Sequence, residues 1–421
     1  MMNKFQKKVL LFLPIFLFSL FLVGCDRDQD YEDVTITVAW WGGDMRTNMT
    51  IEVIELFMEE FPHITVEYVF AGWDEYWTFL NTRAAGDILP DVIQMDMSRI
   101  NEYVDNNLII SLDDFIASGL IDMSDVEPVF QESVKVDGEN MAISLGANAW
   151  AMLYNVDMAR ELGIEFTPDL TWDSFKAILT DARVQLGDEF FGWAGGAYEL
   201  LMMYVRDSGY PVYVEGGLGY SRELLLEYFE MLMDFQDNNI AWSPDIEAGL
   251  QEGVEPVDSG YILASMIPST QIIGRQRQSR SELGLALLPR IDGGRGADFI
   301  RSSMGFSISS QSREQEAAAE FINFFINSVE ANEIMIAERG VPVATTVREH
   351  LRGIVDPEVI HTFDILDLVA AHASPVEPIP PAGQVEIRTA VERVVEQLRF
   401  GVMTPVEAVD YVFDIADRAL R

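Results

Sequence analysis

VTITVAWWGG, from Val34 to Gly43, is the segment that best indicates the fold class. It begins with alternating β-branched residues and ends in two tryptophans and two glycines, which is typical of a strand that runs into a turn. The following segment, Thr50 to Phe61, has helical periodicity, and Ile64 to Phe70 is again strand-like. A strand, a helix and a strand in this order predict a βαβ unit on a parallel sheet.

The alternation of strands and helices continues along the chain. A further helix is predicted at Trp73 to Ala85 and a strand at Asp91 to Met95. Beyond residue 150 the pattern predicts helices at 155–162, 172–186 and 222–238, a strand at 305–309 and a helix at 313–327. A chain of 421 residues is longer than one hydrophobic core usually serves, so we expect two lobes.

The N-terminal segment predicts where the protein works. Three lysines precede an apolar run from Val9 to Val23 that is interrupted only by a proline and a serine. At about fifteen residues this run fits the core of a signal peptide and is short for a membrane-spanning helix, which needs roughly twenty. It ends in Leu22-Val23-Gly24-Cys25, which resembles the bacterial lipobox.

Cys25 is the only cysteine of the chain, so no internal disulfide is possible and lipidation would account for the residue. We therefore expect a lipoprotein signal peptide at 1–24 and an acidic tether at 25–33. The body would then lie outside the cell, held on the outer face of the cell membrane by lipid on Cys25. The alternative is an uncleaved anchor helix with an incidental cysteine, which also leaves the body outside the membrane.

Composition limits the classes of function. The formal net charge of −41 disfavours nucleic acids and anionic lipid surfaces as partners, although strong acidity more often reflects habitat or solubility than a ligand. The four histidines lie in separate contexts, and neither paired cysteines nor an HExxH motif occurs. P-loop, GxGxxG and GxSxG motifs are also missing, so we expect neither a metal nor a cofactor.

Seven segments carry a family resemblance. They are ITVAWWGG (36–43), FPHITVEYVFAGWDEYW (61–77), AAGDILPDVIQMD (84–96), WAMLYNVDMARELGI (150–164), TWDSF (171–175), SSMGFSIS (302–309) and RGVPV (339–343). In this order they resemble the extracellular solute-binding proteins of family 1, which include the oligosaccharide-binding components of ABC importers. The first three are most similar to the subgroup that binds oligosaccharides of plant polysaccharides.

The resemblance implies a two-lobed α/β fold of the periplasmic-binding-protein type (type II), with a hinge of crossover segments and a ligand cleft between the lobes. Mapped onto this chain, it places the lobes at 34–146 plus 303–340 and at 147–302 plus 341–421, with crossovers at 142–151 and 301–306. It further implies a monomer that captures a carbohydrate and hands it to the transmembrane subunits of an ABC permease. The implied function is binding and not catalysis.

Ligands of open α/β sheets sit beyond the carboxyl ends of the strands. We therefore take as candidate ligand contacts five residues at the ends of the first three strands. Trp40, Trp41 and Trp73 are flat rings that suit a sugar face, with core packing as the competing role. Arg46 is either a hydrogen-bond fork for the ligand or a solvated residue. Asp96 is either an acceptor of sugar hydroxyls or a helix cap.

The remaining candidates lie near the crossovers and in the second lobe. Asn148 offers both a donor and an acceptor on the first crossover, beside Trp150. Trp193 and Tyr198 flank two glycines after a predicted strand, and Tyr198 matches the position of a stacking aromatic in maltodextrin-binding members of the family. The last three candidates are Ser269, Ser303 and Met304.

Two rival functions stay open. With sixty-nine acidic residues, a pair of carboxylates suited to glycoside hydrolysis is not excluded by counting, although no pair is singled out. The other rival is a surface sensor or adhesin that uses the same cleft without transport.

Overall fold

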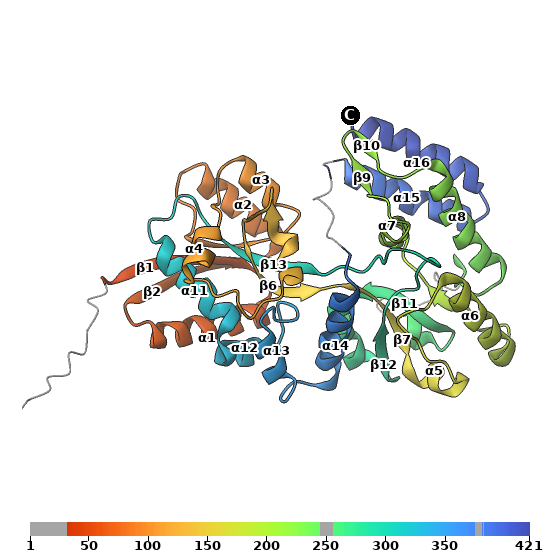
Figure 1. The fold of residues 1–421 in the computed structure, drawn as a ribbon, viewed down its shortest axis with the longest axis horizontal. Helices are drawn as coiled ribbons and strands as arrows, with labels where there is room; N and C mark the ends of the chain where they lie inside the picture. Colours follow the sequence, from red (N-terminus) through yellow and green to blue (C-terminus); the bar gives the residue numbers. More distant parts are fainter. Residues whose placement is uncertain (1–31, 245–255, 375–380, 382) are drawn as a thin grey trace, which may run out of the picture.

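The computed structural model describes residues 32–244, 256–374, 381 and 383–421, and these form the predicted two-lobed α/β fold (Figure 1). Cys25, the predicted signal peptide and most of the predicted tether lie outside the described residues. Within the described part of the chain, no helix is long and apolar enough to cross a membrane.

The first lobe is built on a five-stranded sheet with the order β2-β1-β3-β13-β6. Its strands are β1 (Val34–Trp41), β2 (Ile64–Ala71), β3 (Val92–Met95), β6 (Ile143–Asn148) and β13 (Arg301–Ile308). β1 pairs in parallel with β2 and β3, as the predicted βαβ unit requires, whereas β13 runs antiparallel to β3 and β6. The carboxyl ends of the three parallel strands therefore meet at one edge of the sheet.

Helices cover this sheet because each presents an apolar stripe to it. Those that pack on the first core or adjoin it are α1 (Asp44–Glu60), α2 (Trp73–Ala84), α3 (Ile100–Asp105), α4 (Asp113–Ser118), α11 (Gln315–Asn327), α12 (Val329–Met335), α13 (Thr345–Leu351) and α14 (Pro357–His372). Phe57 of α1 packs edge-on against Phe321 and Phe324 of α11, which ties helices far apart in sequence into one core.

The second lobe is built on a four-stranded mixed sheet with the order β12-β7-β11-β8. Its strands are β7 (Trp150–Asn155), β8 (Gly192–Ala194), β11 (Ile262–Pro268) and β12 (Leu283–Ala286). Its helices are α5 (Val156–Leu162), α6 (Trp172–Leu186), α7 (Tyr198–Asp207), α8 (Arg222–Asp237), α10 (Ile272–Gln278), α15 (Gln384–Arg399) and α16 (Pro405–Ala419). Two-residue strands form the small hairpins β4 (Lys135–Val136)–β5 (Glu139–Asn140) and β9 (Tyr213–Val214)–β10 (Gly217–Leu218).

Two stretches of chain pass directly between the sheets. β6 of the first sheet is separated from β7 of the second by Ala149 alone, and residues 287–300 lead from β12 back to β13. A third segment braces the first crossing, because Ala147 and Val341 exchange two backbone hydrogen bonds of 2.8 and 3.0 Å. Gly340, with a φ of +106°, makes the turn that brings this segment in.

The region after Gly340 packs differently from the expected division of the lobes. Side chains from Val341 to Val369 belong to the hydrophobic core of the first lobe, whereas we expected 341–421 in the second. α14 also contacts β12 and α10, and it lies between the two lobes in Figure 1. Apolar periodicity predicted these helices but could not tell which of two cores their apolar faces join.

Candidate functional site

Trp41 and Trp73 lie together at the carboxyl edge of the first sheet. Trp41 ends β1 and Trp73 begins α2 directly after β2, so the parallel register of the two strands brings them side by side. Their rings meet edge to face at 5.1 Å between centroids. Trp41 is 8% exposed and Trp73 is 42% exposed, so Trp73 carries most of the open aromatic surface. Such a ring suits the apolar face of a sugar.

Trp40 points to the opposite face of the sheet and is fully buried. Its ring lies 5.6 Å from that of Tyr68 and 5.9 Å from that of Phe70, both on the neighbouring β2. The structure thus places Trp40 in the packing of the first lobe and leaves it no surface for a ligand. Both tryptophans of the motif are buried, one on each face, because β1 lies inside the sheet.

Arg46 is held by the protein itself. Its Nε donates to Glu338 Oε2 at 2.8 Å, and its Nη1 donates to the carbonyl oxygen of Trp41 at 3.3 Å. It is therefore neither the solvated residue nor the unoccupied fork that the sequence suggested. Instead it fixes the end of β1 to Glu338, just before the third segment that braces the first crossing.

Asp96 follows β3 at the same edge and does not cap a helix. Its Oδ1 accepts hydrogen bonds from the backbone nitrogen of Ser98 at 2.9 Å and from the Ser98 hydroxyl at 2.5 Å. The helix α3 begins only at Ile100, so these bonds form a local turn. The other carboxylate oxygen has no hydrogen bond to a described residue.

Asn148 and Ser269 link the first crossing to the second lobe. Asn148 Oδ1 accepts from the Ser269 hydroxyl at 2.8 Å and from the Ala149 backbone nitrogen at 2.9 Å. Ser269 opens the short 3-10 helix η4 (Ser269–Gln271) directly after β11, and both residues are buried. The amide oxygen of Asn148 is thus already occupied by Ser269 and Ala149, and only its amide NH2 group is left to donate to a ligand.

The other candidates on the crossings have structural contacts. Trp150 is half-buried and pairs with Pro268 in the second sheet. Ser303 donates its hydroxyl hydrogen to the carbonyl oxygens of Gly146 and Arg339, which joins three segments at one point. Met304 is buried in the first core.

A buried arginine lies behind this junction. Arg339 donates to Gln94 Oε1 at 3.0 and 3.2 Å and to Thr50 Oγ1 at 3.0 Å, and no described carboxylate is within ion-pair distance. Burial, followed by repulsion from Arg46, lowers the pKa of Arg339 to about 9. Gln94 in turn donates to the carbonyl oxygen of Trp41, so this network connects the third segment to the carboxyl end of β1.

Tyr198 begins α7, at the edge of the second lobe that faces the first lobe. Its hydroxyl bonds that of Tyr213 at 2.6 Å, and the guanidinium of Arg388 lies 5.1 Å from its ring centroid. Arg388 also forms an ion pair of 2.7 Å with Glu199. Burial raises the pKa of Tyr198, so this phenol stays protonated at neutral pH. Tyr198 is only 1% exposed, so its ring is buried by packing and offers no open face for a ligand, contrary to the predicted stacking role.

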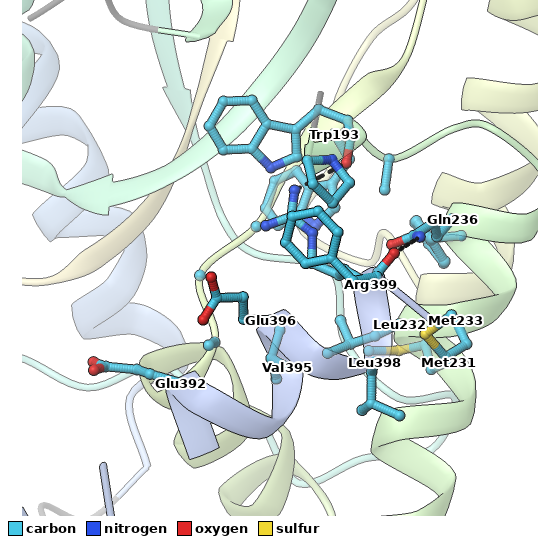
Figure 2. Close-up of a pocket in the computed structure, with 18 of the residues that line it drawn as sticks. Trp193, Met231, Leu232, Met233, Gln236, Glu392, Val395, Glu396, Leu398 and Arg399 are labelled. Atoms are coloured by element: carbon cyan, nitrogen blue, oxygen red, sulfur yellow. Dashed lines mark hydrogen bonds between the residues drawn. The ribbon is translucent and has the colours of Figure 1, made fainter. Parts of the chain in front are cut away.

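Trp193 lies deeper in the second lobe, against Phe175 and Trp172. It lines a cavity of about 720 Å³ between β8, α6, α8 and α15 (Figure 2). In that view Glu396 and Leu398 extend from α15, opposite Met231 and Met233 of α8. A second cavity of about 470 Å³ shares Gly195, Gly196 and Trp242 with the first and reaches Pro268 at the end of β11.

Arg301 lies between the edges of the two lobes. It begins β13 and pairs with Asn148 in β6, so it lies where the chain passes between the lobes. Desolvation lowers its pKa, whereas the charges of Asp96 in the first lobe and Glu199 in the second raise it. We name Asp96, Glu199, Arg301 and Arg388 the interlobe cluster.

Sequence reasoning missed three members of this cluster. Arg301 had a signal, because it is a lone basic residue that opens a strand of small and apolar residues. Glu199 is adjacent to the predicted Tyr198. Arg388 looks like any charged position of an amphipathic helix, so only the tertiary structure identifies it.

A two-lobed α/β body with charged and aromatic side chains of both lobes around its crossings is the architecture of a solute-binding protein. The family model of the bacterial extracellular solute-binding proteins matches residues 46–331. The chain therefore belongs to this family, as its sequence motifs predicted. The family and the fold are those of solute-binding proteins.

Similar proteins support this assignment. A binding protein of Brucella abortus is 23% identical over 307 residues, which cover 70% of this chain and 73% of the relative. A family 1 solute-binding protein of Alicyclobacillus acidocaldarius has the same fold, with a TM-score of 0.84 and 23% identity over 93% of this chain and all of its own. An oligogalacturonide-binding protein of Yersinia enterocolitica has a TM-score of 0.77 and 22% identity over 92% of this chain and all of its own.

Within the described residues, no group of three or more histidine, cysteine, aspartate or glutamate side chains is arranged to hold a metal ion.

Proposed function

We propose that this protein is the substrate-binding component of an ABC importer and captures an oligosaccharide between its lobes. The interlobe cluster carries the proposal, because side chains of both lobes come within electrostatic reach of Arg301 at the crossing. A ligand held by both edges favours the closed arrangement, since only that arrangement offers both sets of contacts. The closed form would then be recognised by the permease.

The chemistry of the two edges favours a sugar. The first edge offers the exposed ring of Trp73 and the free oxygen of Asp96, and the crossing offers the amide donor of Asn148. Flat rings beside hydrogen-bonding groups match the alternating apolar faces and hydroxyl rims of pyranoses. The Yersinia relative binds an oligosaccharide.

The proposal includes a lipid on Cys25 that holds a monomeric receptor at the outer face of the cell membrane. Mass spectrometry of the protein extracted from membranes should find residues 1–24 removed and a lipid on Cys25. An unmodified chain that keeps residues 1–24 would favour the uncleaved anchor helix.

The binding function is tested by a thermal-shift panel of mono- and oligosaccharides, followed by small-angle X-ray scattering with each sugar that binds. A true ligand raises the melting temperature by mass action and lowers the radius of gyration as the lobes close. Chromatography of the same mixtures checks for hydrolysis. Cleavage with turnover would show that the protein is a glycoside hydrolase. A rise in melting temperature with peptides alone would show that the ligand is not a sugar.

A further inference from the structure

Arg301 differs from the other arginines at the crossings because the described protein gives it no partner. Arg46 is paired with Glu338 at 2.8 Å, and Arg388 is paired with Glu199 at 2.7 Å. No described residue forms a hydrogen bond or an ion pair with the guanidinium of Arg301, and its side chain is open to solvent although the surrounding protein partly desolvates it. Arg339 also has no carboxylate partner, but its guanidinium is held by Gln94 and Thr50, whereas Arg301 has neither kind of partner among the described residues.

The position of Arg301 shows where an unused guanidinium can act. Its backbone pairs with that of Asn148, whose side chain reaches Ser269 of the second lobe. Asp96 and Glu199 influence it electrostatically from opposite lobes but do not bind it. A molecule at this crossing would therefore meet a cation with free donors, between the two lobes and on the side of the exposed ring of Trp73.

A guanidinium is selective for planar anions, because two parallel N–H groups match the two oxygens of a carboxylate. A neutral sugar hydroxyl has a single oxygen and no charge, so it does not match the two parallel N–H groups in this way. We propose that Arg301 binds a carboxylate of the ligand, so that the captured sugar contains uronic acid residues. This inference rests on the proposed function and specifies its substrate class.

The surroundings strengthen such a pair. The walls of the crossing already withdraw Arg301 partly from water, which lowers its pKa, and a guanidinium nevertheless remains charged at neutral pH. Closure of the lobes would remove more water and strengthen the attraction to a ligand carboxylate. The acidic remainder of the molecule repels anions at long range, so binding of an acidic sugar depends on this local charge.

The test compares digalacturonic acid with the neutral disaccharide galactobiose by isothermal titration calorimetry. We expect the wild type to prefer the acid, and added NaCl to weaken that preference. Arg301→Gln should reduce affinity for digalacturonic acid about ten- to hundredfold and leave affinity for galactobiose unchanged, because it removes a charged hydrogen-bonding group. Arg301→Lys should restore only part of the loss, since lysine lacks the fork.

Arg280→Gln is the matched control. Arg280 is exposed and lies before β12, at the end of the second sheet away from the crossing, so this variant removes one positive charge without altering the interlobe cluster. Unchanged melting temperatures of the ligand-free variants show that folding is intact.

Two results would overturn the inference in different ways. If the wild type binds galactobiose as tightly as digalacturonic acid, or if Arg301→Gln still prefers the acid, Arg301 does not recognise a carboxylate of the ligand. The proposed sugar-binding function is then unaffected. If the wild type binds neither disaccharide nor any other saccharide of the panel, the inference falls together with the proposed function.

Discussion

Trp73 is the residue whose role in binding is simplest to test, because one face of its ring is open. Its ring is 42% exposed and is held by Trp41 and Trp77, so truncation removes ligand surface and little core. Trp73→Ala should weaken oligosaccharide binding about tenfold, in line with roughly 1–1.5 kcal/mol for an aromatic contact. Titration followed by tryptophan fluorescence measures this loss.

The control for that substitution is Tyr261→Ala. Tyr261 is 40% exposed and precedes β11, at the end of the strand far from the crossing. Equal affinity losses in both variants would show that Trp73 acts through general stability and not through the ligand.

Asp298 provides a pH-dependent prediction. It is buried beside the second crossing, and burial raises its pKa to about 6, with Arg290 acting in the opposite direction. The folded chain therefore holds this proton more tightly than the unfolded chain, whose aspartates titrate near pH ~3.9. Its contribution to the free energy of unfolding is favourable below about pH 4 and is lost as the pH rises to about 6.

Asp298→Asn keeps the side chain neutral at every pH. It should raise the free energy of unfolding by about 1–3 kcal/mol at pH 7 and change it little at pH 4. Urea unfolding between pH 4 and 7 measures the difference, with the exposed Asp292→Asn of the same loop as control. A difference that does not vary with pH would contradict the assignment.

Among the secondary-structure elements, β6 and the segment around Gly340 depend most closely on each other. A Cβ on Gly146 would press into the carbonyl group of Arg339 and approach the carbonyl carbon of Gly340 to 2.9 Å. Gly146→Ala should therefore push the third segment off the first crossing and cost about 1–3 kcal/mol. Urea unfolding measures the cost.

Gly274→Ala is the opposite case within a helix. An added Cβ there meets nothing within 4 Å, so the variant should gain up to about 1 kcal/mol from helix propensity. The two glycine substitutions are thus expected to change the free energy of unfolding in opposite directions. A Gly146→Ala variant with unchanged stability would show that the third segment and the first crossing are not in tight contact.

The elements also show how far local sequence pattern reaches. The pattern predicted β1 and α6 with the bounds that the structure has, and it set the limits of α8 within one residue. It predicted β13 four residues too late, at Gly305, because Arg301 to Ser303 are polar and the residues before Gly305 gain their strand partners only from β6.

At the scale of the whole molecule, the net charge of −41 opposes the compact state. Raising NaCl from 20 to 500 mM shortens the range of this repulsion to a few ångströms, so the melting temperature of the ligand-free protein should rise by about 5 °C. Differential scanning calorimetry gives the shift. A fall in melting temperature would mean that surface ion pairs outweigh the repulsion, and a rise with NaCl but not KCl would indicate a bound sodium ion.

The α/β class, the two lobes and the family were predictable from the sequence alone, because β-strand alternation, helical periodicity and motif order are local properties of the chain. The sequence also placed Trp41, Trp73 and Asp96 at one edge, since parallel strands align their carboxyl ends. Which of these side chains stay open was decided only by the tertiary structure. Packing against β2 buried Trp40, Glu338 engaged Arg46 from 292 residues away, and the crossing left Arg301 without a partner between two lobes.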